Sequence, residues 1–183
     1  MRALGLLGVY SGGAGVVAAA ALAFSHGLRA PPGPAKSLDA ATSVLFVLAG
    51  AIGMHYAFLF NQSATGFGEL SRLRQLAKER GEKPPTLSDV KYGRTSARVL
   101  AADRCMGNFL EQLPPFVLSL LAYTLFVSAN GAAALGWAWL GFRSYYPLAY
   151  SRPFPTLLLS TMPAYACVWW MICASVYKAA ALS

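Results

Sequence analysis

A long segment in the second half of the chain is almost free of charge, and this feature constrains the fold most. Between Gln112 and Tyr177 the only charged side chains are Arg143 and Arg152. A water-soluble domain carries about 25 % charged residues and does not leave so large a surface uncharged. The whole chain is only 12 % charged and is 56 % hydrophobic. The sequence therefore predicts an integral membrane protein.

Several segments are long and apolar enough to be considered as membrane spans, since a helix needs about 20 mostly apolar residues to cross the hydrocarbon core. These segments are Leu4–Phe24, Ala40–Phe60, Met106–Val127, Ala132–Tyr150 and Thr156–Tyr177. We expect an all-α, multi-pass membrane bundle. Residues 1–36 would form an additional N-terminal hydrophobic helix with a Pro-rich linker, and residues 37–183 would form a four-helix domain.

The first apolar segment has two interpretations. Arg2 followed by an apolar, Ala-rich run resembles a secretory signal or an organellar presequence. The run of about 20 residues is longer than the roughly 7–15 residues of a signal-peptide core, which favours a retained helix. Gly12, Gly13 and Gly15 also suit close packing against another helix.

One polar region, residues 61–103, contains most of the Lys and Arg side chains. Basic loops stay on the cytoplasmic side of a membrane, so this region is predicted to face the cytoplasm or its organellar equivalent. Counting the spans places Arg152 on the same side. The net charge of +8 follows from this clustering and does not argue for a nucleic-acid partner.

Two local signals divide the polar region. Gly81, Pro84 and Pro85 predict a turn in its middle. Ser88 and Asp89 then offer an N-cap for a helix that runs into the membrane.

Three polar side chains interrupt the next apolar segment. Arg104, Asn108 and Glu111 are spaced i, i+4 and i+7, which places them on one face of a helix. Each would be costly to expose to lipid, so together they must face protein, water or a ligand. Ionisable residues at membrane depth are a functional-site hypothesis by default.

A second set follows at Arg143, Tyr146 and Tyr150, spaced i, i+3 and i+7. Arginine binds carboxylates, glutamate accepts an ammonium group, and Asn and Tyr satisfy peptide groups, so the two sets suit a small zwitterion. The alternative is structural: Arg104 and Glu111 would form a buried network that specifies helix packing, and the tyrosines would form an interfacial aromatic belt.

Metal chemistry finds little support. Cys105, Cys167 and Cys173 have no paired spacing and are predicted to be small buried residues. His26 and His55 are far apart in the sequence, and His55 reads as a hydrogen-bonded packing residue. We expect no metal site, and neither a phosphate-binding loop nor a catalytic triad is evident.

Three motifs make the sequence recognisable. They are Arg104-x-x-x-Asn108-x-x-Glu111-x-x-Pro114, a short turn at Gly131-Ala132-Ala133-Ala134, and Arg143-x-x-Tyr146-x-x-x-Tyr150. In this order and at this spacing they resemble the MAPEG family, the membrane-associated proteins in eicosanoid and glutathione metabolism. That family includes microsomal glutathione transferases, leukotriene C4 synthase and prostaglandin E synthase. The resemblance covers roughly residues 40–177.

The resemblance implies a four-helix bundle that assembles as a homotrimer and holds glutathione, as co-substrate, between neighbouring subunits near the cytoplasmic face. By motif position the glutathione-binding residues would be Arg104, Asn108, Glu111, Arg143, Tyr146 and Tyr150. Active members use the thiolate to attack a lipophilic electrophile or a lipid hydroperoxide. A thiol with a pKa near 8.5 needs a nearby cation or hydroxyl donor to ionise at neutral pH.

The chain also departs from the family pattern. Several family enzymes activate the thiol with an Arg several residues beyond the second motif tyrosine, whereas here Arg152 is the only cation between Tyr150 and Lys178. Arg152 is therefore the candidate catalytic residue, and Gln112 stands where some members have Tyr. Two functions stay open: a glutathione transferase or peroxidase with a small lipophilic substrate, or a catalytically degenerate structural subunit of a larger membrane complex. The endoplasmic reticulum or an organelle (mitochondrial or plastid) membrane is the expected location.

Overall fold

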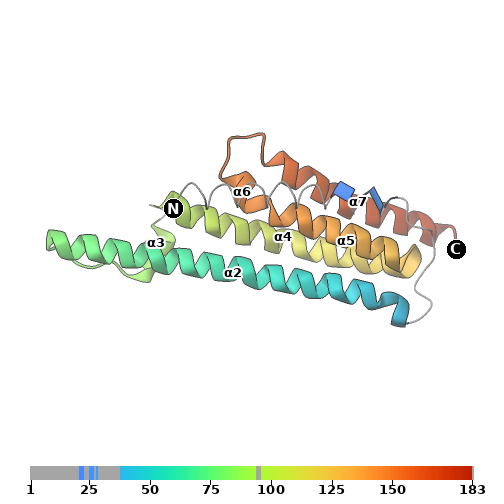
Figure 1. The fold of residues 1–183 in the computed structure, drawn as a ribbon, viewed down its shortest axis with the longest axis horizontal. Coiled ribbons are helices and arrows are strands. Elements are labelled where there is room, and N and C mark those ends of the chain that lie inside the picture. Colours follow the sequence, from blue (N-terminus) through green and yellow to red (C-terminus); the bar gives the residue numbers. More distant parts are fainter. Residues whose placement is uncertain (1–20, 23–24, 27, 29–37, 94–95, 183) are drawn as a thin grey trace. The chain divides into compact units, whose positions relative to one another are not determined.

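Every long element in the described part of the chain is a helix. The computed structural model describes residues 21–22, 25–26, 28, 38–93 and 96–182. Its helices are α2 (Leu38–Arg80), α3 (Leu87–Tyr92), α4 (Ala97–Phe126), α5 (Ala129–Ser144), α6 (Tyr146–Tyr150) and α7 (Leu158–Ala180) (Figure 1). The prediction of an all-α membrane bundle is confirmed. The predicted N-terminal helix, Leu4–Phe24, lies almost entirely outside the described residues.

Three of the described helices, α2, α4 and α7, are long and apolar enough to cross a membrane. The predicted span Ala132–Tyr150 is instead divided into α5 and α6, with Tyr145 between them. The cause is Pro147, which has no N–H to donate to the carbonyl of Arg143 four residues earlier. The Tyr145 N–H donates to that carbonyl, and α5 ends there.

The polar region at residues 61–103, predicted to be a basic loop between two spans, is helical in its first half, because α2 continues to Arg80. Polar residues mark where a helix leaves the hydrocarbon but do not break the helix. The pair between the Arg72 guanidinium and the Glu69 carboxylate, 2.7 Å apart at spacing i, i+3, supports this exposed part. The turn falls where it is predicted and starts at Gly81, whose φ of 66° is accessible to glycine without strain.

The helix after this turn begins earlier than predicted, and Thr86 caps it rather than Ser88 or Asp89. The Asp89 carboxylate accepts from the Thr86 backbone N–H at 2.8 Å and from the Thr86 hydroxyl at 2.8 Å, while the Thr86 hydroxyl accepts from the Asp89 N–H at 3.3 Å. This is a capping box. Accepting these bonds holds the pKa of the Asp89 carboxyl below its usual value. The capped helix, α3, has only six residues, too few to cross a membrane, whereas the sequence predicted a helix that runs into the membrane.

The chain forms two compact units. One comprises Met1–Ile52 and Gln112–Ser183. Within its described part α5 packs on α7, and the Phe116 and Trp139 rings stack with centroids 3.9 Å apart. Gly131–Ala134, predicted as a turn, belongs to α5, since Ser128 caps that helix by accepting from the Gly131 N–H at 3.1 Å.

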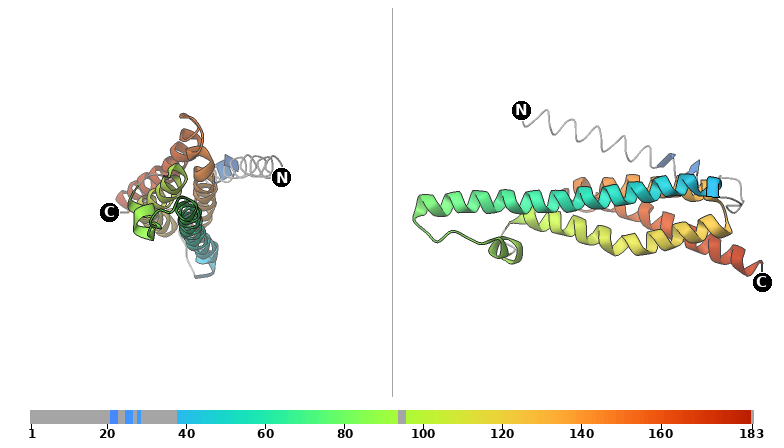
Figure 2. Two further views of the ribbon diagram at one scale, coloured as in Figure 1. Left: turned by 90° about the vertical axis from the view of Figure 1, so that its left-hand side faces the viewer. Right: turned by 90° about the horizontal axis from the view of Figure 1, so that it is seen from below.

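The second unit is Gly53–Glu111. Here α3 folds back beside the later part of α2 (Figures 1 and 2). Leu70 of α2, Val90 of α3 and Val99 of α4 form its buried cluster, with Leu73 packed against it. These contacts hold the three helices around the cavity described below.

Candidate functional site

The three polar residues of α4 lie along one face of a long helix that can cross a membrane. Arg104 and Glu111 are exposed on the single chain, and Asn108 is half-buried. Their separation of seven residues is about two turns, so the face predicted from the sequence exists in the structure. Exposed charges on such a helix require a cover other than lipid.

The second predicted set lies in the other unit, where Arg143 is almost completely buried. It is 1 % exposed, and its guanidinium lies 4.8 Å from the centroid of the Tyr146 ring and 5.9 Å from that of Trp139. A guanidinium attracted to two ring faces holds those rings in place. The structure therefore gives Arg143 the geometry of a positioning residue for Tyr146.

Tyr146 and Tyr150 form a stacked pair on α6. Their ring centroids are 6.0 Å apart with an interplanar angle of 26°. Tyr146 is buried and Tyr150 is half-buried, so the pair reaches from the interior towards the surface. Phe116 stacks on Trp139, and the Arg143 guanidinium lies between Trp139 and Tyr146. The unit therefore contains a series of aromatic rings with one cation in it, and the series ends at the two tyrosines.

Arg152 lies in the turn between α6 and α7, two residues beyond Tyr150. It is half-buried, and its backbone N–H donates to the Ala149 carbonyl at 3.2 Å. This short turn keeps the Arg152 backbone close to the end of α6, which carries the tyrosines. The structure thus groups Arg143, Tyr146, Tyr150 and Arg152 in one unit, and Arg104, Asn108 and Glu111 in the other.

A groove that the sequence did not reveal lies between α4 and α7. Its volume is about 290 Å³, and it is lined by Gln112, Pro115, Tyr165, Val168 and Trp169. Such a mixture of aromatic and apolar walls with two polar groups suits a lipophilic molecule. The sequence carried no signal for it, because Tyr165 and Trp169 are ordinary residues of an apolar span until α7 packs.

The remaining predicted residues give a mixed outcome. Cys105 and Cys167 are buried as predicted, whereas Cys173 is exposed. His55 packs against the Tyr56 and Phe109 rings, at centroid distances of 5.3 and 6.4 Å. Its Nδ1 atom is buried without a hydrogen-bond partner, so the predicted hydrogen bond is not made at that atom. Among the described residues, no group of three or more His, Cys, Asp or Glu side chains is placed to hold a metal ion.

The fold and these residues define an all-helical membrane protein with a polar face on one span and a tyrosine pair after the next helix. The model of the MAPEG family matches residues 40–177, well over half of the chain. The chain therefore belongs to the MAPEG family, as its motifs predicted. No curated protein matches the chain, and no solved structure matches it.

Proposed function

We propose that this membrane protein binds glutathione through Arg104, Asn108, Glu111, Tyr146 and Tyr150. The observation that carries the proposal is the exposure of Arg104 and Glu111 on a membrane-spanning helix. A cation and a carboxylate two turns apart complement the carboxylate and ammonium groups of a small zwitterionic peptide. Membership of the MAPEG family supports this choice of ligand, because the family is related to glutathione metabolism.

Each side chain has a distinct role in this proposal. Arg104 pairs with a carboxylate of glutathione, and the Glu111 carboxylate accepts hydrogen bonds from its ammonium group. Asn108 forms hydrogen bonds with a peptide group of the ligand. The Tyr146 and Tyr150 hydroxyls supply further donors, while Arg143, buried beneath Tyr146, keeps that ring in position. Because the exposed charges need cover, the site is completed by a neighbouring copy of the chain in a homotrimer.

Chemistry on the bound thiol requires that its pKa fall. A thiol with a pKa near 8.5 is only a few per cent ionised at pH 7, and a nearby cation raises the thiolate fraction. Arg143 is buried against Trp139 and Tyr146, whereas Arg152 is half-buried in the turn that follows Tyr150, and we propose that Arg152 performs this role. The thiolate would then attack a lipophilic electrophile or a lipid hydroperoxide, and the groove at Gln112 and Tyr165 has the apolar walls to hold it.

One observation favours a second function. Beyond Arg152 the sequence has no cation until Lys178, so a single side chain must activate the thiol. If Arg152 does not do so, the protein is a non-catalytic subunit of a larger membrane complex. The absorbance of the bound thiolate, measured as described below, separates the two functions.

The test is calorimetric titration of the detergent-purified protein with glutathione. Arg104→Ala should weaken binding about tenfold or more, since a hydrogen bond to a charged group contributes roughly 1.5–3 kcal/mol. Tyr146→Phe should have a smaller effect. Arg98→Ala, an exposed arginine on the same helix, is the matched control and should bind as the wild type does. Absence of glutathione binding by the wild type would overturn the proposal.

The ultraviolet absorbance of the bound thiolate then tests the role of Arg152. In an enzyme the thiolate signal appears near neutral pH, and Arg152→Ala removes it while glutathione affinity stays nearly unchanged. A wild type that binds glutathione but shows no thiolate below pH 8 identifies the non-catalytic subunit.

A further inference from the structure

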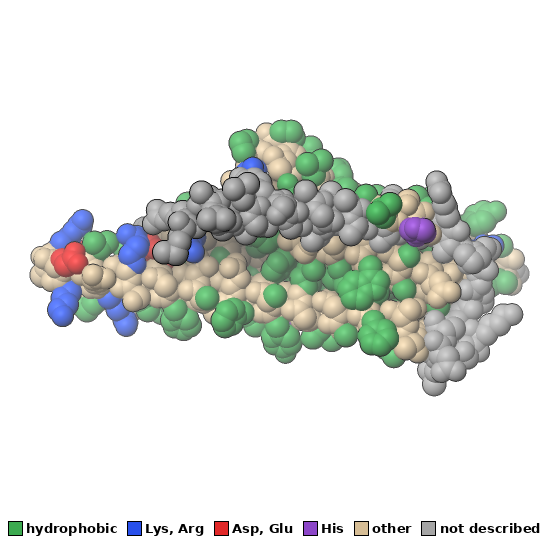
Figure 3. Space-filling model, viewed as in Figure 1, with side chains coloured by type: hydrophobic (Ala, Val, Ile, Leu, Met, Phe, Trp, Pro, Cys, Tyr) green, Lys and Arg blue, Asp and Glu red, His purple; other side chains and the backbone are tan. Residues whose placement is uncertain are grey.

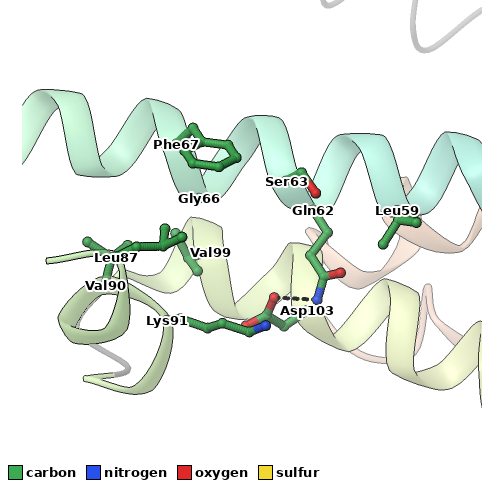
Figure 4. Close-up of a pocket in the computed structure, with 10 residues that line it drawn as sticks. All are labelled: Leu59, Gln62, Ser63, Gly66, Phe67, Leu87, Val90, Lys91, Val99 and Asp103. Carbon is green, nitrogen blue, oxygen red and sulfur yellow. Dashed lines mark hydrogen bonds between the residues drawn. The ribbon is translucent and has the colours of Figure 1, made fainter.

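A second cavity lies entirely within the unit Gly53–Glu111, between α2, α3 and the start of α4. Its volume is about 230 Å³, below the roughly 300–1,000 Å³ of sites for drug-sized ligands. Its lining residues are Leu59, Gln62, Ser63, Gly66, Phe67, Leu87, Val90, Lys91, Val99 and Asp103 (Figure 4). The size suits a headgroup or a small polar molecule.

The polar atoms of this cavity carry both signs of charge. The Gln62 amide donates from Nε2 to Oδ1 of Asp103 at 2.8 Å and thereby orients the carboxylate. The Lys91 side chain extends towards Asp103 along the cavity (Figure 4). An ammonium and a carboxylate in one small cavity suit a zwitterion better than an anion or a cation alone.

The position of the cavity along α2 sets its depth in the membrane. No Asp, Glu, Lys or Arg occurs from residue 41 to residue 68, and a span uses about 20 of these residues. A span of this length that begins at residue 41 ends near residue 60, which places Gln62 to Phe67 at the level of the lipid headgroups. Along α2 the charged side chains begin at Glu69, and blue and red side chains gather at the end of the molecule where this later part of α2 lies (Figure 3).

The rim of the cavity is apolar and exposed. Phe67 is 58 % exposed and Leu87 is 41 % exposed, and both line the cavity. Tyr92, next to Lys91 on α3, is 72 % exposed. Exposed large apolar side chains beside an exposed lysine and a half-buried aspartate describe a site that opens to acyl chains on one side.

We propose that this cavity binds the headgroup of a phospholipid with a primary amine, that is, of the phosphatidylethanolamine class. The Asp103 carboxylate accepts from the lipid ammonium, Lys91 pairs with the phosphate, and Phe67 and Leu87 contact the first part of the acyl chains. The negative charge of the Asp103 carboxylate repels a headgroup with a net negative charge and so disfavours its binding. A trimethylammonium headgroup is larger and has no N–H to donate to the carboxylate.

This site is separate from the proposed glutathione site. Asp103 and Arg104 are neighbours in α4 and so point about 100° apart around the helix. Arg104, Asn108 and Glu111 do not line the cavity. Failure of one proposal leaves the other untouched.

Native mass spectrometry of the delipidated full chain measures the binding. The probes are dioleoyl-phosphatidylethanolamine and dioleoyl-phosphatidylcholine. The wild type should prefer the ethanolamine lipid about tenfold, and Asp103→Asn, which keeps the hydrogen bond possible with Gln62, should remove that preference. Lys91→Gln should weaken the binding of both lipids. Glu82→Gln and Lys78→Gln, matched charge losses at exposed positions outside the cavity, should change neither value.

A steric variant tests the same site without altering charge. Gly66 lines the cavity, and a Cβ added there meets nothing within 4 Å, so Gly66→Leu adds bulk at the cavity without a clash at its Cβ. It should reduce ethanolamine-lipid binding about tenfold or more. Gly68→Leu is the matched control, because Gly68 also has open space but does not line the cavity. Equal affinity of the wild type for both lipids, or unchanged binding by Gly66→Leu, would overturn the proposal.

Discussion

At the scale of single residues, Arg143 has a role that its neighbours determine. It is the charged side chain most deeply buried among the described residues, at 1 % exposed. A buried guanidinium is tolerated because its flat surface is weakly hydrated and stacks on aromatic rings, which an ammonium group does less well. Trp139 and Tyr146 supply those rings. The charge thus contributes to packing at the base of the tyrosine pair.

The first prediction follows from this geometry. Arg143→Lys keeps the charge but loses the planar stacking, so it should destabilise the protein by about 1–2 kcal/mol. Thermal unfolding in detergent, followed by tryptophan fluorescence because Trp139 is adjacent, measures the change. Arg98→Lys, at an exposed position, should stay within about 0.5 kcal/mol of the wild type. An unchanged melting temperature for Arg143→Lys would refute the packing role.

At the scale of helices, Gly136 permits the close approach of three elements. A Cβ at this position would lie 2.5 Å from Cγ1 of Val47 in α2 and 3.1 Å from Cδ1 of Leu120 in α4. Val47 is fully buried and β-branched, so it has little freedom to move away. Small residues allow helices in membranes to pack this closely.

Gly136→Ala is therefore expected to destabilise the bundle by about 1–3 kcal/mol, the usual cost of an overpacked core. Gly53→Ala is the matched control, because Gly53 is also inside a helix but has nothing within 4 Å of its added Cβ. That control should be neutral or stabilising by roughly 0.5–1 kcal/mol, since alanine favours the helix. Chemical denaturation in mixed micelles compares the two. Equal stability of the two variants would contradict the close contact.

Helix positions were largely predictable from the sequence, whereas helix ends were not. An apolar run predicts the part of a helix that lies inside the membrane, but it does not predict where the helix ends. The helix α2 continues through Glu69 and Arg72, because Glu and Arg form helices well in water. The break at Tyr145 depends on Pro147, which the spacing of Arg143, Tyr146 and Tyr150 concealed.

The candidate site shows the same division. The face shared by Arg104, Asn108 and Glu111 could be predicted from the sequence, because the period of one helix is enough to place the three side chains together. The burial of Arg143, the groove at Tyr165 and the cavity at Asp103 each require contacts between helices. Lys91 reaches the cavity only because the turn after Arg80 folds α3 back along α2. Periodicity contains no information about such contacts.

At the scale of the whole molecule, the distribution of charge predicts topology. The basic residues lie mainly between residues 61 and 103, and this region and Arg152 should share the cytoplasmic side. The turn before Ala129 should lie on the opposite side, because α4, which lies between them in the chain, is long and apolar enough to cross the membrane.

Cysteine labelling in sealed vesicles checks this topology. In a Cys173→Ser background, which removes the exposed thiol, Arg80→Cys and Arg152→Cys should react with an impermeant maleimide from the same side. Asn130→Cys, at an exposed position, should react only from the other side. Labelling of positions 80 and 152 from opposite sides would refute the charge-based topology.

The connection between α4 and α5 has a consequence for biosynthesis. Only Val127 and Ser128 separate the two helices, and both of their N–H groups donate to the Tyr123 carbonyl at 2.9 Å. With 16 residues, α5 is about 24 Å long, shorter than the roughly 30 Å hydrocarbon core. We expect α5 to leave the translocon together with α4, as a helical hairpin. Tyr146 follows α5 in the chain, so the second ring that contacts the Arg143 guanidinium is synthesised only after this hairpin is complete.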